Sequence, residues 1–574
     1  MKKILLALGA IALDLGAQIP AQDARLKAIE GTKHAYRMPQ YSSLDQWSAR
    51  KDRLRKQILA AAGLLPLPER ASVRAQVFRR IERRGYSVES VYLETLPGYY
   101  LSGNLYRPLQ RKAPFPGIVS PHGHWRNGRL ENSDLASVPG RAINLARQGY
   151  VVFSYDMVGY ADTKQTEHKF GDDREHLYNF HPLGLQLWNS IRALDFVESL
   201  PDVDPQRLGA TGASGGGTQT FLLFAVDDRV KAAVPVNMIS GGMQGGSICE
   251  NAPGLRHDTF NVDFGAMMAP RPMLLVSATG DWTKEVPAVA FPAIRQVYNL
   301  YGAAEKLESV QFDSPHNYHT QSREAMYSFF QRTLLGLPGG EVKEEPFTLE
   351  PSEDLLVWYK RTLPDNARDL AGISQQWREL TRLRRPDREA LGYALSVETP
   401  RNVLSESNGG RVVLHGGKGD RVPALWQDGQ GDSLVVVHAE GAEAARASAP
   451  AAGRPALYLD VWQTGSARAP RDTSAGHFYT FHRTDAQNRV QDILTALAWI
   501  TARSRGPVEL RCPGEAGIWC LFAASVFEGK LKLRAESAGF SGSDDEFLTR
   551  FFVPGIQRVG GIKTALSLTA AYRE

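Results

Sequence analysis

Cysteine is scarce in this chain of 574 residues, which has only 3. Three cysteines cannot form a disulfide framework; at most one pair can form, and one thiol then stays free. Long apolar runs are also lacking. The most apolar stretch at the N-terminus, residues 4–13, is too short to cross a bilayer. The sequence therefore excludes a disulfide-stapled scaffold and predicts no membrane span.

A strong excess of charge of one sign is absent as well. The chain has 67 basic and 62 acidic residues, a net charge of +5, and the basic residues are dispersed. No phosphate-binding or dinucleotide-binding glycine motif accompanies its 53 glycines. We therefore expect no nucleic acid partner and no nucleotide cofactor.

One glycine-rich segment does carry a chemical signal. Residues 207–217 form an apolar approach into Gly212-Ala-Ser214-Gly215-Gly-Gly. A Gly-x-Ser-x-Gly pattern between a strand and a helix is typical of the nucleophile elbow of an α/β-hydrolase, in which the serine occupies a sharp, strained turn. The pattern predicts Ser214 as a nucleophile; the alternative is a simple turn serine.

The surrounding order favours the nucleophile. Upstream, an apolar strand at 115–120 ends in Pro-His122-Gly-His124-Trp125, a position from which a backbone amide can enter an oxyanion hole. With the amide of the residue after the serine, this nominates His124 and Gly215. A strand at 150–155 and a helix at 183–200 complete a β-α-β-α-β order, which predicts a mostly parallel, doubly wound sheet.

Two further strands each end in a candidate catalytic side chain. Asp281 follows the strand at 273–278, and His316 follows the strand at 306–312. The chain order Ser, Asp, His is the order of the α/β-hydrolase triad. In this interpretation His316 removes the proton of Ser214, and Asp281 orients the imidazole and stabilises its charged form. Glu250 remains an alternative acid and His319 an alternative base.

Other side chains near these loops are candidates for substrate binding: His122, Trp125, Trp282 and Glu250. Packing at the sheet edge is the alternative for the aromatic ones. A polar cluster in one insertion has a spacing that fits no standard metal motif; its members are His168, Asp172, Asp173, His176 and His181. We therefore predict no metal and no cofactor.

The segments 122–125, 212–217 and 278–281 resemble the bacterial dienelactone-hydrolase and acetyl xylan esterase-like α/β-hydrolases, many of which are secreted carbohydrate esterases. The resemblance covers roughly residues 40–335. It implies hydrolysis of a carboxylic ester, such as an acetyl group on a polysaccharide. Glucuronoyl esterases are a more distant group that carries Arg directly after the nucleophile, where this chain has Gly215. A prolyl-oligopeptidase-type serine peptidase and a non-enzymatic carbohydrate-binding protein are the alternatives.

The length predicts a second core. Tyr-x-Phe-His occurs at 178–181 and again at 479–482, and each copy precedes a helix and an elbow-like segment. By this comparison Ala516 stands at the nucleophile position of the second copy. We expect a catalytic domain at 22–337, a linker at 338–350, and a degenerate, non-catalytic α/β-hydrolase-like domain at 351–574.

The N-terminus resembles an export signal. Met1-Lys-Lys precedes the apolar stretch 4–13, and Ala17 or Ala21 ends a possible cleavage site. We expect residues 1–21 to be removed and the mature protein to be periplasmic or secreted.

Overall fold

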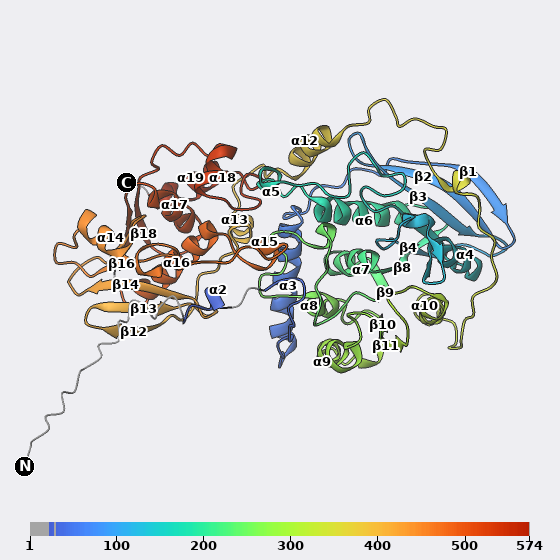
Figure 1. Ribbon diagram of the computed structural model, residues 1–574, viewed down its shortest axis with the longest axis horizontal. Helices are drawn as coiled ribbons and strands as arrows, with labels where there is room; N and C mark the ends of the chain where they lie inside the picture. Colours follow the sequence, from blue (N-terminus) through green and yellow to red (C-terminus); the bar gives the residue numbers. More distant parts are fainter. Residues whose placement is uncertain (1–21, 28–29, 505, 573–574) are drawn as a thin grey trace, which may run out of the picture.

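Two β-sheets, each covered by helices, form the two halves of the molecule (Figure 1). The computed structural model describes residues 22–27, 30–504 and 506–572. The predicted signal peptide, residues 1–21, lies outside the described residues. Within the described part of the chain, no helix combines the length and the apolar character needed to cross a membrane.

The first sheet has nine strands in the order β1-β2-β3-β7-β4-β8-β9-β10-β11. The first three form an antiparallel meander, β3 pairs antiparallel with β7, and the remaining neighbours are parallel. Buried strands rich in β-branched residues are typical of a parallel sheet covered on both faces. The strands are β1 (Ala75–Arg83), β2 (Tyr86–Leu96), β3 (Tyr99–Pro108), β4 (Phe115–Val119), β7 (Val151–Tyr155), β8 (Val203–Ala213), β9 (Val230–Val236), β10 (Met273–Ala278) and β11 (Leu307–Phe312).

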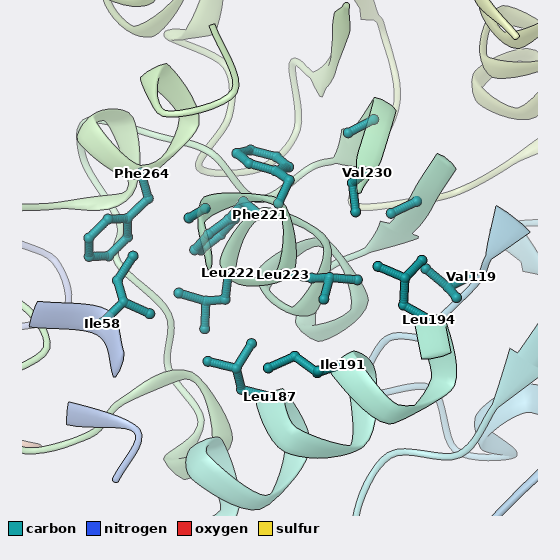
Figure 2. Close-up of a cluster of buried hydrophobic side chains, with 14 of the residues drawn as sticks. Ile58, Val119, Leu187, Ile191, Leu194, Phe221, Leu222, Leu223, Val230 and Phe264 are labelled. Carbon is teal, nitrogen blue, oxygen red and sulfur yellow. The ribbon is translucent and has the colours of Figure 1, made fainter. Parts of the chain in front are cut away.

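Helices cover both faces of this sheet. One face packs in a large apolar cluster with α3 (Leu44–Ala61), α6 (Pro182–Glu198), α7 (Gly215–Val226), α8 (Asn261–Ala266) and α9 (Phe291–Leu300). Figure 2 shows its centre, where Leu187 and Ile191 of α6 lie near Leu222 and Leu223 of α7. The other face packs against α4 (Val138–Gln148) and α10 (Thr320–Thr333). The predicted doubly wound α/β-hydrolase fold is confirmed.

The second sheet has seven strands in the order β12-β13-β14-β16-β15-β17-β18. One face packs against α13 (Arg388–Leu395), α16 (Asp485–Thr501), α17 (Ala516–Val526), α18 (Asp544–Arg550) and α19 (Gly561–Leu568), and the other against α14 (Ala442–Ser448). The strands are β12 (Leu404–Asn408), β13 (Arg411–His415), β14 (Arg421–Gln427), β15 (Leu434–Val437), β16 (Ala456–Leu459), β17 (Val508–Cys512) and β18 (Leu531–Ala535).

The two sheets share their pattern of connections. Each begins with three antiparallel strands, continues through a strand that pairs antiparallel with the third, and then runs parallel. The first sheet continues through β10 and β11, and among the described residues the second has no strand after β18. The second sheet therefore lacks counterparts of the two strands that precede Asp281 and His316.

The turn between the central strand and the next helix contains a residue with positive φ in both halves. At this turn, the residue with positive φ is Ser214 (58°) in the first half and Gly514 (59°) in the second half. Glu515, which follows, already has helical backbone angles (φ −59°, ψ −32°). By this backbone feature, Gly514 is the residue of the second half that resembles Ser214, two positions before the Ala516 of the sequence comparison. No hydroxyl stands at that turn.

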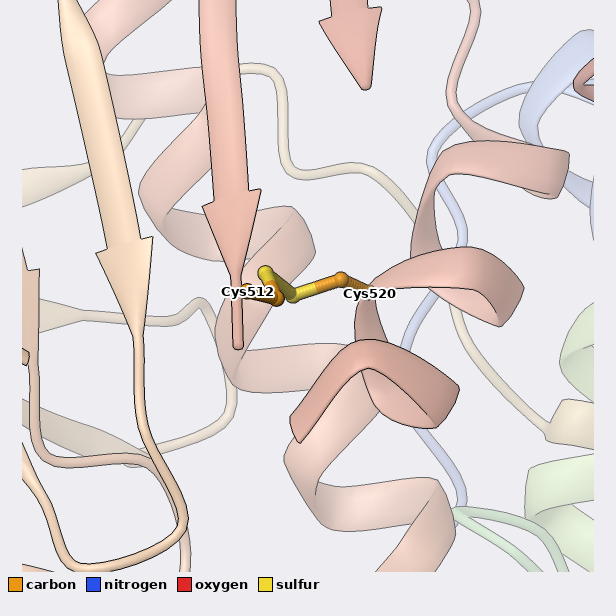
Figure 3. Close-up of a disulfide and its surroundings, with 2 residues drawn as sticks. All are labelled: Cys512 and Cys520. Carbon is orange, nitrogen blue, oxygen red and sulfur yellow. A yellow bond between two sulfur atoms is a disulfide. The ribbon is translucent and has the colours of Figure 1, made fainter. Parts of the chain in front are cut away.

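A disulfide joins Cys512, at the end of β17, to Cys520 in α17, beside the same turn (Figure 3). Cys249 is buried and is not in a disulfide. With three cysteines the sequence allows at most one disulfide and leaves one thiol free, and the structure has this arrangement.

The segment between the two sheets contacts the first half over much of its length. Phe347 packs against the α4 face of the first sheet, and the Trp358 indole donates to Ser102 Oγ at 3.0 Å. Three short helices interrupt this segment: α11 (Ser352–Leu355), α12 (Leu370–Thr381) and α13. Trp377 of α12 is fully buried in the core of the first half. Pro364 and Pro386 lie between these helices, where a residue without a backbone N–H cannot continue the helical hydrogen bonding.

Candidate active site

The nucleophile elbow lies between β8 and α7. Ser214 has φ 58° and ψ −126°, a strained conformation for a residue with a side chain. Neighbouring glycines allow this turn to pack closely, because a Cβ on Gly216 would lie 2.6 Å from the carbonyl oxygen of Pro121 and 2.7 Å from that of His122. The elbow holds Ser214 at the carboxyl edge of the sheet, where it is partly exposed.

Asp281 and His316 meet at the same edge. The His316 Nδ1–H donates to Asp281 Oδ2 at 2.7 Å. The other carboxylate oxygen, Oδ1, accepts from the Thr283 amide at 2.6 Å and from its hydroxyl at 2.5 Å. The Asp281 side chain is 2% exposed. This carboxylate can therefore fix the imidazole with Nε2 as the proton acceptor.

His316 Nε2 is buried and has no hydrogen-bond partner among the described residues, Ser214 Oγ included. Gly123 lies between Ser214 and the Trp125 ring, because a Cβ on it would lie 3.1 Å from Ser214 Cβ and 3.0 Å from Trp125 Nε1. The Trp125 ring in turn stacks on the His316 ring, with their centroids 6.0 Å apart. Nucleophile–base hydrogen bonds are often long without substrate, so this arrangement is compatible with proton transfer between them.

Two amides are available to bind a negatively charged oxygen. The Gly215 amide opens α7, and the first amides of a helix have no acceptor within the helix. The His124 amide lies in the loop that Gly123 presses against the serine. Within the part of the chain that the structure describes, neither amide has a backbone acceptor. Both are free to stabilise a tetrahedral intermediate.

Comparisons with known proteins agree with this geometry. The acetyl xylan esterase family model matches residues 75–240. The solved structure of methylesterase BT1017 is 30% identical, covers 62% of this chain and is itself covered over 78% of its length, with a TM-score of 0.51. The chain belongs to the acetyl xylan esterase-like α/β-hydrolases. That membership makes it a carboxylic ester hydrolase.

Two further similarities complete the comparison. The putative hydrolase YtaP of Bacillus subtilis (strain 168) is 26% identical over 303 residues, which is 49% of this chain and 98% of YtaP. A glucuronoyl esterase from Caldicellulosiruptor kristjansonii is 17% identical, covers 60% of this chain and is covered over 98%, with a TM-score of 0.39.

The absence of a side chain at Gly215 has a direct cause in this acetyl xylan esterase-like hydrolase. A Cβ there would lie 2.5 Å from Cε1 and 2.8 Å from Nδ1 of the His124 ring. The His124 imidazole therefore covers the residue after the nucleophile. An arginine at this position would collide with that ring unless the ring moved.

His122, a predicted substrate-binding candidate, is bonded to the backbone within the protein. It is fully buried; its Nδ1–H donates to the Gly123 carbonyl at 2.6 Å, and its Nε2 accepts from the Met157 amide at 2.9 Å. Burial lowers the pKa of His122 to about 3, so the ring stays neutral. It joins the loop after β4 to the loop after β7, because it binds the backbone of both.

Glu250 is also occupied elsewhere. Its Oε2 accepts from the amides of Gly246 and Ser247, each at 3.0 Å, and its Oε1 accepts from the Thr218 hydroxyl at 3.2 Å. The side chain is buried, and among the described residues His316 pairs with Asp281 and not with Glu250. Glu250 therefore folds its own loop onto α7 and is neither the acid partner of His316 nor exposed to a substrate.

The two predicted tryptophans flank the candidate base. The Trp282 ring centroid lies 4.4 Å and the Trp125 centroid 6.0 Å from the His316 ring. Both tryptophans are half-buried, so each retains an accessible surface beside the imidazole. His319, the alternative base, instead caps α10 by accepting from the Ser322 amide at 3.2 Å.

Thr283 is the positioning residue that sequence reasoning missed. Its hydroxyl donates to Asp281 and also accepts from the Ala278 amide at 3.0 Å, which anchors the acid loop to the end of β10. The only sequence signal is an Asp with a threonine two residues later, a common turn pattern.

Proposed function

We propose that this chain is a serine esterase that hydrolyses carboxylic esters of carbohydrates through an acyl-serine intermediate. Ser214 attacks the ester carbonyl, and His316 removes its proton and returns it to the leaving alcohol. Asp281 stabilises the imidazolium, while the amides of Gly215 and His124 bind the oxyanion. Water then releases the acid by the same steps in reverse order.

The observation that carries this proposal is the state of His316. Its Nδ1 is bonded to the buried Asp281 carboxylate at 2.7 Å, and its Nε2 is buried without a partner among the described residues. A buried imidazole nitrogen without a partner is costly in a purely structural role. A substrate or the serine hydroxyl would satisfy it.

The aromatic surfaces beside His316 favour a sugar ring as part of the substrate. Trp125 and Trp282 flank the imidazole on two loops, so a pyranose bound near the base would contact at least one indole. We propose acetyl esters of a polysaccharide as the substrates, in line with the family model. The 30% identity to a methylesterase favours a second candidate, the methyl ester of a polymeric uronic acid.

Product analysis distinguishes the two candidates. Purified full-length protein is incubated with acetylated xylan and, separately, with a methyl-esterified polyuronide, and acetate and methanol are quantified. Acetate release that Ser214→Ala abolishes supports the first candidate, and methanol release with the same dependence supports the second. Release of neither, with 4-nitrophenyl acetate still hydrolysed, would contradict the carbohydrate assignment.

We further propose that the second half is a degenerate copy of the hydrolase fold that holds a substrate loop. The Gly254 amide donates to Tyr479 O at 2.8 Å, and the Arg256 amide donates to Thr480 O at 2.9 Å. The buried guanidinium of Arg256 then bonds Glu250 O at 2.8 Å. The second half therefore binds the backbone at Gly254 and Arg256, and the Arg256 side chain binds the loop that carries Glu250 and packs on α7.

Export to the periplasm or the medium is part of the proposal. The Cys512–Cys520 disulfide supports it, because such bonds persist mainly in oxidising compartments.

A further inference from the structure

Three side chains from separate loops converge beside the elbow without belonging to the catalytic machinery. They are the ring of His124 from the loop after β4, His168 from the segment after β7, and Cys249 from the loop after β9. His124 Nε2 lies 3.1 Å from Cys249 Sγ. One ligand atom from each of the three side chains lies within 4.8 Å of the other two.

His168 is oriented as a metal ligand would be. Its Nδ1–H donates to the Val158 carbonyl at 2.7 Å, which leaves the lone pair on Nε2. That Nε2 is buried and has no hydrogen-bond partner among the described residues. The ring centroids of His168 and His124 are 5.3 Å apart. The backbone here is tightly packed, since a Cβ on Gly159 would lie 2.2 Å from the His168 nitrogen.

Cys249 supplies a soft donor. Of the 3 cysteines, the other two are joined in the disulfide, so Cys249 is the only free thiol. One thiolate and two imidazoles form a donor set that suits Zn²⁺, with metal–ligand distances of about 2.0–2.3 Å. Ligand atoms already within 4.8 Å of one another need only small side-chain movements to reach such a site.

We propose that His124, His168 and Cys249 bind one Zn²⁺ ion, with a fourth position left for water or a small anion. The Cys249 thiol loses its proton to solvent as the metal–sulfur bond forms. The ion joins the loop that carries an oxyanion amide to the loop that carries Glu250. It therefore stabilises the architecture of the site and is not needed for the acyl transfer itself.

The spacing of the ligands explains why no sequence motif reveals this site. The ligands are separated by 44 and 81 residues in the chain (168 − 124 and 249 − 168), and only the sheet brings their loops together. The other histidines of the predicted polar cluster point elsewhere. His176 pairs with Asp173 at 3.7 Å, and His181 caps α6.

Cobalt titration tests the proposal. Co²⁺ is added to metal-free, full-length protein, and thiolate-to-metal charge-transfer absorption is recorded. We expect saturation at one ion per chain, loss of the band in Cys249→Ser, and loss or strong weakening in His168→Gln. His176→Gln, a histidine of the same segment outside the cluster, should retain it. Because Cys249 is the only free thiol, any such band reports on this site.

Zinc affinity measured by competition with a chromophoric chelator gives the second readout. Loss of an outer-shell partner weakens metal binding 10- to 100-fold, so loss of the ligand His168 should weaken it by about 100-fold or more. The melting temperature of the wild type should rise with zinc concentration, while that of His168→Gln should not. Absence of the band in folded wild-type protein, or equal zinc affinity in wild type and His168→Gln, would overturn the proposal.

Discussion

At the scale of single residues, the site depends on the distinct environments of two buried carboxylates. Asp281 bonds the imidazole and the Thr283 hydroxyl, whereas Glu250 is saturated by amides of its own loop and by Thr218. Both acids follow strands in the sequence, so the pattern alone could not choose between them. The choice depends on which loop reaches His316.

Paired variants separate these two roles. Asp281→Asn should lower kcat by about 10³- to 10⁴-fold, because the amide presents the wrong hydrogen-bonding partner to the imidazole. Glu250→Gln retains an oxygen acceptor for the loop amides and should lower kcat less than about tenfold. Initial rates with 4-nitrophenyl acetate measure both. The assignment fails if Glu250→Gln is the more damaging change.

Position after a strand or at the elbow predicted that Ser214, His316 and the two tryptophans lie near one another, and the structure places them at one edge of the sheet. It did not predict which groups the neighbouring side chains bind. His122 was a substrate-binding candidate by position, yet its two ring nitrogens bind the backbone of two loops. Thr283 and Cys249 depend on contacts between distant segments. Such contacts follow from tertiary packing, which no local pattern encodes.

At the scale of elements, the N-terminus of α6 depends on a neutral histidine. His181 Nδ1 accepts from the Gly184 amide at 3.2 Å, and its Nε2–H donates to the Ala61 carbonyl at 2.8 Å, which joins α6 to α3. Protonation would remove the acceptor of the cap. Burial accordingly lowers the pKa of His181 to about 3.

This cap should make stability depend on pH. The unfolded chain binds a proton on His181 below about pH 6.5 and the folded chain does not, so stability falls as the pH decreases from there toward 3. At pH 5 the loss from this group is about 2 kcal/mol. His181→Asn keeps a capping acceptor and should reduce the decrease in stability between pH 7.5 and pH 5 by about that amount. Urea unfolding at both pH values measures it; an identical decrease in both proteins would contradict this role.

Element boundaries in the first half follow closely from apolar patterning, caps and turn residues. The position of the elbow-like turn in the second half does not follow from such patterns. The sequence comparison matched Ala516 to Ser214 by short identities, whereas the residue with positive φ at this turn is Gly514. Short identities therefore do not define the backbone conformation of this turn.

At the scale of the molecule, the two halves share cores. Trp377, which follows the first half in sequence, is fully buried in its core, while Leu177 from the first half is buried in the core of the second. Arg25, near the N-terminus, pairs with Asp492 in the second half at 2.7 Å. The three contacts tie the halves together at separate points, and we expect them to unfold together.

Calorimetry tests this cooperativity. Trp377→Ala should cost about 3–5 kcal/mol and shift one unfolding transition of the full chain to lower temperature. Trp426→Ala, which removes a ring packed on Trp499 within the second half, should shift the same transition. Two separate endotherms, of which each variant moved only one, would show that the halves unfold independently.

Labelling with a fluorophosphonate shows whether Ser214 is an activated nucleophile, because such a probe reacts only with an activated serine. Intact-mass and peptide analysis should find one label per wild-type chain, attached to Ser214, and none on Ser214→Ala. The same variant should lose about 10³-fold or more of the kcat for 4-nitrophenyl acetate. Labelling at another residue, or full activity in Ser214→Ala, would show that Ser214 is not the nucleophile.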